Sequence, residues 1–196
     1  MAVLSRRAQV AGARRATEDA LLEATLSLLA EGLPFAELSI DQIVKRAGLS
    51  RPTFYSYFRD KRALVLRLGV EFEEDLAKVA VPWLESADGD VRDTLEGVLA
   101  VFQKHATTLS AVVEAATYDA DVAEFWGAFH ARFRPGGEAR VRAGNPDLDE
   151  ESVRARAYTL IYMTESSITT QVLRPAVDAD ALITQLAFMW DAATGG

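Results

Sequence analysis

The sequence predicts an all-α protein of about nine helices, with an N-terminal three-helix domain followed by a larger helical domain. Apolar residues recur at helical spacing along most of the 196 residues, and Gly, Pro, Asp and Ser positions separate these segments. Charge divides the chain in the same way. Residues 1–62 carry ten Lys and Arg against seven Asp and Glu, a balance of +3, whereas residues 63–196 carry eleven against twenty-two, a balance of −11.

Composition excludes several classes of function. The absence of cysteine rules out disulfides, thiolate metal sites and a thiol nucleophile. Two histidines on different predicted helices, His105 and His130, without an HExxH, GxSxG or P-loop pattern, indicate no enzyme, no catalytic residue, no metal and no cofactor. No apolar run approaches the roughly 20 residues that cross a bilayer, and the N-terminus lacks a signal-peptide core, so we expect a cytoplasmic protein without membrane contact.

The first domain is expected over residues 16–62, preceded by a flexible basic arm over residues 1–15. Arg14 and Arg15 stand just before a helix start predicted at Thr17, where they could reach phosphates or a minor groove. The alternative is a disordered tail without a function. The helix that follows is predicted from the apolar spacing of Leu22, Leu26 and Leu29, and Gly32 marks its end.

Residues 38–58, LSIDQIVKRAGLSRPTFYSYF, predict two short helices joined by a tight turn. Ser39 and Gln42 have the spacing of a capping box at the start of the first helix. Gly48 permits the turn, because glycine enters the left-handed region without steric cost. Ser50 is expected to cap the second helix, with Pro52 in its first turn, where a missing N–H costs little.

The second of these helices has a polar outer face. Phe54 and Phe58 are four residues apart and should pack inward. The remaining side chains are of the kinds that contact base edges and phosphates: Arg51, Pro52, Thr53, Tyr55, Ser56 and Tyr57. A short amphipathic helix with tyrosines at its rim is also common in helical proteins without nucleic acid. Asp60 should cap the next helix, whose N-terminus, with Lys61, suits a phosphate.

The second domain, residues 63–196, is predicted to be helical throughout. Its first helix should end before Pro82, and another should start at residues 88–90. A stripe of aromatic residues begins after Asp121 and should stop at residues 134–137, Arg-Pro-Gly-Gly, because proline and glycine break or kink helices. Long helices are expected over residues 149–173 and 178–193.

The last helix has more apolar residues than one buried face can use: Leu182, Ile183, Leu186, Met189 and Trp190. A second interface explains this excess, so we expect a homodimer that forms through the last two helices. A helix at the centre of a monomer is the alternative.

The run SIDQIVKRAGLSRPTFYSYFRDKRAL, residues 39–64, resembles the N-terminal DNA-binding domain of the TetR family of transcriptional regulators, over about residues 16–68. Residues 122–133, VAEFWGAFHARF, are similar to the ethionamide-resistance regulator branch of that family. The break expected at residues 134–137 departs from the family pattern of a continuous helix. The resemblance implies double-stranded DNA as partner, with phosphate contacts by Ser39, Tyr57 and Lys61. Base or phosphate contacts are implied for Arg51, Pro52, Thr53 and Tyr55, and Ser50 joins the candidates at the helix start.

The resemblance also implies a ligand-responsive repressor that binds a palindromic operator as a dimer and is released by a small hydrophobic effector. Candidate effector-binding residues are Phe102, Trp126, Phe129, Phe133, Ile161, Thr164 and Glu165. At this spacing the aromatic residues also fit a plain hydrophobic core. The functional alternative is a helical DNA-binding module without an effector, such as a nucleoid-associated or cell-division factor, whose C-terminal domain binds a protein.

Overall fold

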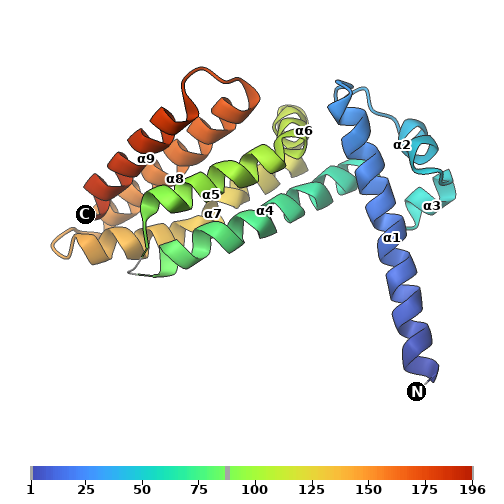
Figure 1. The fold of residues 1–196 in the computed structure, drawn as a ribbon, viewed down its shortest axis with the longest axis horizontal. Coiled ribbons are helices and arrows are strands. Elements are labelled where there is room, and N and C mark those ends of the chain that lie inside the picture. Colours follow the sequence, from blue (N-terminus) through green and yellow to red (C-terminus); the bar gives the residue numbers. More distant parts are fainter. Residues whose placement is uncertain (1, 87–88, 196) are drawn as a thin grey trace. The chain divides into compact units, whose positions relative to one another are not determined.

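The computed structural model describes residues 2–86 and 89–195 and forms two compact units, Met1–Leu68 and Gly69–Gly196. Nine α-helices and no strand occur within these described ranges (Figure 1). The prediction of an all-α protein of about nine helices is therefore confirmed. Within residues 2–86 and 89–195, no helix is long and apolar enough to cross a membrane.

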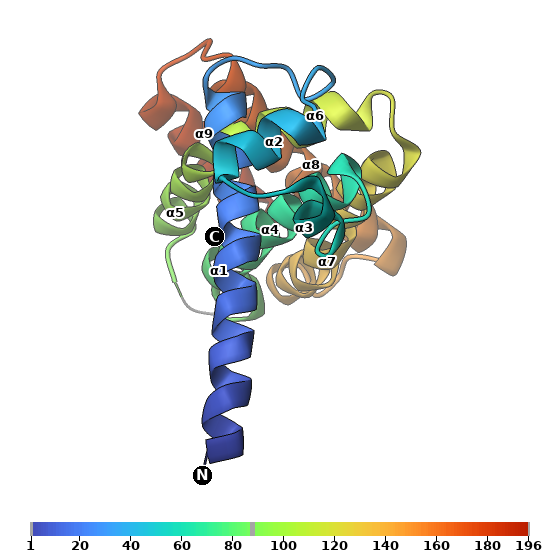
Figure 2. The same ribbon diagram turned by 90° about the vertical axis from the view of Figure 1, so that its right-hand side faces the viewer.

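The N-terminal unit contains three complete helices and the start of a fourth: α1 Ala2–Ala30, α2 Ile40–Ala47, α3 Arg51–Tyr55 and α4 Lys61–Glu85. The predicted start of the first helix at Thr17 is wrong, because α1 already begins at Ala2. Residues 2–15 lack an apolar stripe, but they are rich in alanine and arginine and contain no proline, so intrinsic propensity favours a helix there. The first half of α1 extends beyond the part that packs against α2 and α3 (Figure 1 and Figure 2).

Buried apolar side chains hold α1, α2 and α3 together: Leu21, Leu38, Ile43, Phe54 and Phe58 are all at most 5 % exposed. Two ion pairs add specific links at the rim of this core. Arg46 on α2 donates to both carboxylate oxygens of Glu31, at 2.7 and 2.8 Å. Arg67 Nε on α4 lies 3.0 Å from Glu18 on α1. The small core thus sets the positions of α2 and α3.

The C-terminal unit contains the rest of α4 and five further helices: α5 Val91–Lys104, α6 Ala106–Ala116, α7 Ala120–Gly144, α8 Glu150–Leu173 and α9 Ala179–Thr194. Aspartate carboxylates cap the starts of four of them by accepting backbone N–H groups: Asp90, Asp119, Asp149 and Asp178. The helices predicted to start near these positions are therefore confirmed. Asp88, the first residue of one predicted start, lies outside the described residues.

Both predicted breaks at proline are wrong. Helix α4 continues through Pro82 to Glu85. Its last turn is held by packing, because Trp83 and Leu84 are buried, and by Arg140, whose Nη1 donates to the Trp83 and Ser86 carbonyls at 2.8 and 2.5 Å. Tertiary contacts thus offset the hydrogen bond that a proline removes.

Helix α7 likewise continues through Pro135 to Gly144. The two glycines after the proline allow neighbouring helices to approach closely. A Cβ atom at Gly136 would lie 2.8 Å from Cβ of Leu84 on α4, and one at Gly137 would lie 2.9 Å from Cδ1 of Ile161 on α8. Glycine here permits close packing instead of ending the helix, and the packing holds the helical conformation.

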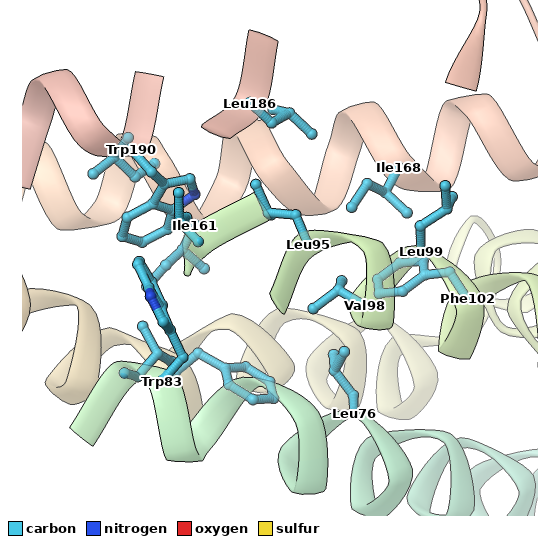
Figure 3. Close-up of a cluster of buried hydrophobic side chains, with 14 of the residues drawn as sticks. Leu76, Trp83, Leu95, Val98, Leu99, Phe102, Ile161, Ile168, Leu186 and Trp190 are labelled. Carbon is cyan, nitrogen blue, oxygen red and sulfur yellow. The ribbon is translucent and has the colours of Figure 1, made fainter. Parts of the chain in front are cut away.

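The core of the C-terminal unit lies between α4, α5, α6, α7, α8 and α9. Figure 3 shows Trp83 of α4 and Trp190 of α9 approaching each other, with Leu95 and Ile161 close by. The two indole rings meet edge to face, with centroids 5.2 Å apart. This meeting of helices is where a small cavity remains.

Candidate nucleic-acid interface and effector cavity

Local hydrogen bonds specify the start of α2 and the turn after it. The Ser39 side chain accepts from the backbone N–H of Gln42, and the Gln42 side chain accepts from the Ser39 N–H at 2.8 Å, so the predicted capping box is present. Gly48 ends α2 in the left-handed conformation with φ +68°. The Leu49 N–H then donates to Val44 O at 2.8 Å. These bonds set the direction in which the chain enters α3.

The start of α3 is fixed in the same way. Ser50 Oγ accepts from the Thr53 N–H at 3.3 Å and lies 2.8 Å from Thr53 Oγ1. Phe54 is buried, with its ring centroid 5.6 Å from that of Tyr55. Because Phe54 points inward, Arg51 and Pro52 are exposed and Tyr55 is 50 % exposed. The polar face predicted for this helix therefore stands outside the domain core.

Arg51 is engaged within the protein. Its Nη1 donates to both carboxylate oxygens of Asp41 at 2.8 Å, and its Nη2 donates to the Tyr55 hydroxyl at 3.2 Å. Asp41 was not predicted as a partner of Arg51, because an acidic residue in the first turn of α2 is already explained by its favourable interaction with the helix dipole. Hydrogen bonding to Asp41 raises the pKa of Arg51 above its usual value.

The Lys61 ammonium lies against the turn after α1. Its Nζ donates to the carbonyls of Phe35 and Ala36 at 2.8 Å and of Leu38 at 3.1 Å. A phosphate contact by this side chain would have to compete with these bonds. Asp60, as predicted, caps the start of α4, since its carboxylate accepts from the Ala63 N–H at 2.8 Å.

Two further candidates lie close together. The Arg14 guanidinium of α1 stands over the Tyr57 ring, 5.7 Å from its centroid. Arg15 and Ser39 are exposed on the same unit but lie outside this pair. The structure thus joins Arg14 to Tyr57 and Arg51 to Tyr55.

A cavity of about 70 Å³ lies within the C-terminal unit. Six predicted effector residues line it: Phe102, Phe129, Phe133, Ile161, Thr164 and Glu165. Trp126 is not among the lining residues. Its ring stacks on Phe129 with centroids 5.0 Å apart, which places it one turn of α7 away from the cavity.

Much of the cavity wall was not predicted from the sequence: Leu76, Ala80, Trp83, Leu84, Val91, Thr94, Leu95, Val98 and Trp190. Trp83 and Leu84 were missed because the helix was expected to end before Pro82. The apolar stripe of α5 did indicate a buried face, but helical spacing does not tell a cavity wall from solid core.

Polar groups on the lining residues mostly have partners. Trp190 Nε1 donates to Thr164 Oγ1 at 2.9 Å. The Glu165 carboxylate lies 2.9 Å from His130 Nε2 and accepts from the Thr169 hydroxyl at 2.6 Å. With these atoms satisfied, the wall offers mainly hydrocarbon and aromatic surface to a ligand.

The two histidines take part in side-chain contacts in the C-terminal unit. His130 is buried between α7 and α8, where Tyr162 stacks on it at a centroid distance of 3.9 Å. Burial raises the pKa of that tyrosine. His105 lies 3.0 Å from Asp75 on α4. Within the described part of the chain, no three His, Asp or Glu side chains are grouped as a metal site would require.

A capped helix, a left-handed glycine turn and a second helix with an exposed polar face together define a helix-turn-helix DNA-binding domain. Residues 21–68 match the family described as bacterial regulatory proteins, tetR family. The N-terminal domain is therefore that of the TetR family of transcriptional regulators, as the sequence resemblance predicted.

Relatives of known name agree with this assignment. The chain is 28% identical over 181 residues to the HTH-type transcriptional regulator EthR of Mycolicibacterium smegmatis, covering 88% of this chain and 83% of the relative. EthR of Mycobacterium tuberculosis is 33% identical over 112 residues, which cover 54% of this chain and about half, 51%, of that protein. The predicted similarity to the ethionamide-resistance regulator branch is thus confirmed at this level of identity.

Solved structures share the fold. A TetR-family regulator from Syntrophomonas wolfei superimposes with a TM-score of 0.71 at 19% identity, covering 92% of this chain and 96% of the other. Salmonella enterica GusR gives a TM-score of 0.68 at 21% identity, with the same coverage of 92% and 96%. At these identities the likeness concerns the fold alone.

Proposed function

We propose that this regulator is a repressor that binds a palindromic operator as a homodimer and is released by a small hydrophobic effector. One observation carries the proposal: helix α4 begins in the DNA-binding unit and also supplies Leu76, Trp83 and Leu84 to the cavity wall. A ligand that moves these side chains therefore acts on the helix that leads into the helix-turn-helix domain. Such a regulator works on DNA in the cytoplasm.

Exposed apolar residues support a dimer through α8 and α9. Phe188 is 63 % exposed, Met189 49 % and Tyr158 48 %, while the opposite face of α9 buries Ile183 and Trp190. Large exposed apolar side chains on adjacent helices are typical of a protein interface. In a two-fold dimer the same surface from each subunit would meet.

Phe188→Glu tests this interface. The variant should be a monomer by light scattering and should bind palindromic DNA more weakly than wild type, because the second half-site is lost. Gln103→Glu adds the same charge at an exposed position of α5, outside the proposed interface, and tests the effect of charge alone. A Phe188→Glu protein that stays dimeric would contradict the interface.

In the proposed dimer, helix α3 of each subunit enters one of two successive major grooves, so the half-sites should be about one helical turn or slightly more apart. Selection from random DNA should therefore enrich a palindrome of that spacing. Tyr57→Phe should weaken binding to all sequences alike, whereas Thr53→Ala should change the preferred sequence. Wild-type protein that enriches no sequence at physiological salt would contradict operator binding.

Effector binding requires the cavity to grow, because small-molecule sites usually measure about 300–1,000 Å³ and this one measures about 70 Å³. The effector would therefore favour a conformation in which the helices around the cavity stand further apart. Occupancy should lower affinity for the operator by moving α4.

Ala80→Leu tests this step by placing three additional carbons at the cavity wall. The variant should bind operator DNA as wild type does but fail to release it with hydrophobic compounds that shift the wild-type melting temperature. Ala100→Leu, at an exposed position of α5, is the matched control. Equal release by Ala80→Leu and wild type would place the effector elsewhere.

The small cavity volume also favours a second candidate, a DNA-binding module without an effector whose C-terminal unit binds a protein. In that case the cavity is only a packing gap. No compound in a thermal-shift screen would then both stabilise the protein and release DNA, and a protein partner would instead change its DNA occupancy.

A further inference from the structure

The clearest feature not used by the proposed function is the contact between Asp41 of α2 and Arg51 of α3. Arg51 is the one cationic side chain in the five residues Arg51–Tyr55 of α3. Its side chain is 51% exposed and that of Asp41 is 66% exposed. Both groups therefore lie at the surface of the domain, on the two helices of the helix-turn-helix.

Stability does not explain this pair, because exposed ion pairs contribute little to folding and are screened by salt. A carboxylate is also an unfavourable group beside DNA, where it meets the negative charge of the phosphates. The presence of the Asp41 carboxylate beside Arg51 therefore indicates a function that requires a negative charge next to this arginine.

The hydrogen bonds fix the plane of the Arg51 guanidinium. Asp41 holds Nη1 through two contacts of 2.8 Å, and the Tyr55 hydroxyl accepts one hydrogen of Nη2 at 3.2 Å. Asp41 contacts Nη1 alone, so it leaves uncovered the edge of the planar group that is formed by Nε–H and the adjacent hydrogen of Nη2. Two adjacent, parallel N–H donors match the O6 and N7 acceptors of guanine in the major groove.

We propose that Asp41 positions Arg51 to read a guanine in each half-site of the operator. An unsupported arginine samples many rotamers and can donate equally well to a phosphate. Asp41 and Tyr55 restrict the side chain before binding, so less conformational entropy is lost when the guanine contact forms. Asp41 is thus a positioning residue, and Arg51 is the group that touches the base.

The inference rests on the proposed operator binding, and random-site selection with the full-length dimer tests both. Wild type should enrich a palindrome with one guanine per half-site that depends on Arg51. Arg51→Lys should lower the preference for guanine at that position by about tenfold or more, since a good bidentate contact discriminates by that much. Asp41→Asn should lower the same preference a few-fold and leave the other positions unchanged.

Charge and carboxylate chemistry are separated by two further variants. Glu23→Gln removes one negative charge from an exposed position of α1 and should leave every base preference unchanged. Asp41→Glu keeps a carboxylate and should retain more of the guanine preference than Asp41→Asn. These readouts concern one base position, which a general loss of stability would not alter selectively.

Two results would overturn the inference. One is a selected palindrome in which no guanine depends on Arg51. The other is tighter binding of Asp41→Asn to all sequences with unchanged preferences, which would mean that Asp41 only repels phosphate. Failure of the operator proposal is distinct, because wild type itself would then enrich no sequence.

Discussion

The two units of the chain position their functional side chains by different means. In the N-terminal unit, exposed groups such as Arg51 and Tyr55 are placed by caps and a glycine turn within about twenty residues. In the C-terminal unit, the cavity exists only because five helices from distant parts of the sequence meet. The positions of exposed DNA-binding side chains can therefore be set by local sequence, whereas an enclosed cavity depends on the packing of the whole domain.

The largest effect should come from removing a central aromatic side chain in either unit. Phe54 is 0 % exposed and Phe102 is 1 % exposed, and Phe→Ala changes in cores cost about 3–5 kcal/mol. All three tryptophans, Trp83, Trp126 and Trp190, lie in the C-terminal unit, so their fluorescence reports on that unit. Phe102→Ala should lower the urea midpoint of the fluorescence transition, whereas Phe54→Ala should abolish operator binding and leave that midpoint unchanged.

The control for this pair is the truncation of an exposed aromatic side chain, Tyr118→Ala, which should leave the fluorescence midpoint unchanged. Equal shifts of the fluorescence midpoint by Phe54→Ala and Phe102→Ala would show that the two units unfold as one cooperative block, and the contrast between them would not hold.

The second largest effect should come from breaking the hydrogen bond between Trp190 and Thr164 at the cavity wall. Thr164→Val removes the acceptor of the Trp190 N–H, and leaving a buried donor unpaired costs about 1–3 kcal/mol. Urea unfolding followed by tryptophan fluorescence should show this loss. Thr159→Val, at an exposed position of the same helix, is the control and should change stability little. Equal stability of the two variants would mean that the Trp190 hydrogen bond contributes nothing.

A helix cap in the DNA-binding unit should have a smaller effect. Ser50→Ala removes the oxygen that accepts from the Thr53 N–H, and such caps contribute about 1 kcal/mol. Amide hydrogen exchange at residues 51–58 should become faster, while exchange in α8 stays the same. Ser110→Ala, at an exposed position within α6, tests for a general effect of the substitution. Unchanged exchange at residues 51–58 would contradict local specification of α3.

The smallest effects concern two carboxylates on α4 whose pKa values move in opposite directions. Hydrogen bonds from Lys104, Lys78 and His105 hold the pKa of Asp75 well below its usual value of 3.8. Asp75 therefore stabilises the fold above that value, and the contribution is lost as pH falls through the lower folded-state pKa. Asp75→Asn should be destabilised at about pH 7, and its difference from wild type should shrink below about pH 4.

Glu73 supplies the contrast, because burial raises its pKa above the usual 4.5. The contribution of Glu73 to the free energy of unfolding is fully present below pH 4.5, and it is lost as the pH rises through the higher folded-state pKa. Glu73→Gln should therefore gain stability relative to wild type as pH rises towards about 7. Urea midpoints across this pH range measure both variants. A change of the same sign for both would contradict these assignments.

Residues placed by local hydrogen bonds could be predicted from the sequence, whereas residues placed by helix packing could not. Ser39, Gly48 and Ser50 were predicted correctly as cap and turn residues, because each acts on neighbours within five residues. The pairing of Asp41 with Arg51 was missed, because it depends on how two helices pack. Trp83 was missed because the loss of one hydrogen bond at Pro82 was expected to end α4, whereas buried contacts beyond the proline hold the last turn.

The close packing at Gly136 and Gly137 has a dynamic consequence. Leu84 and Ile161, the side chains against which these glycines pack, also line the cavity. If the cavity expands and displaces Leu84 or Ile161, residues 134–137 lose packing contacts. These residues have the weakest helical propensity in α7. Residues 134–137 should then be a point of local unwinding, with amides that lose protection as the cavity fills and recover it when the cavity closes.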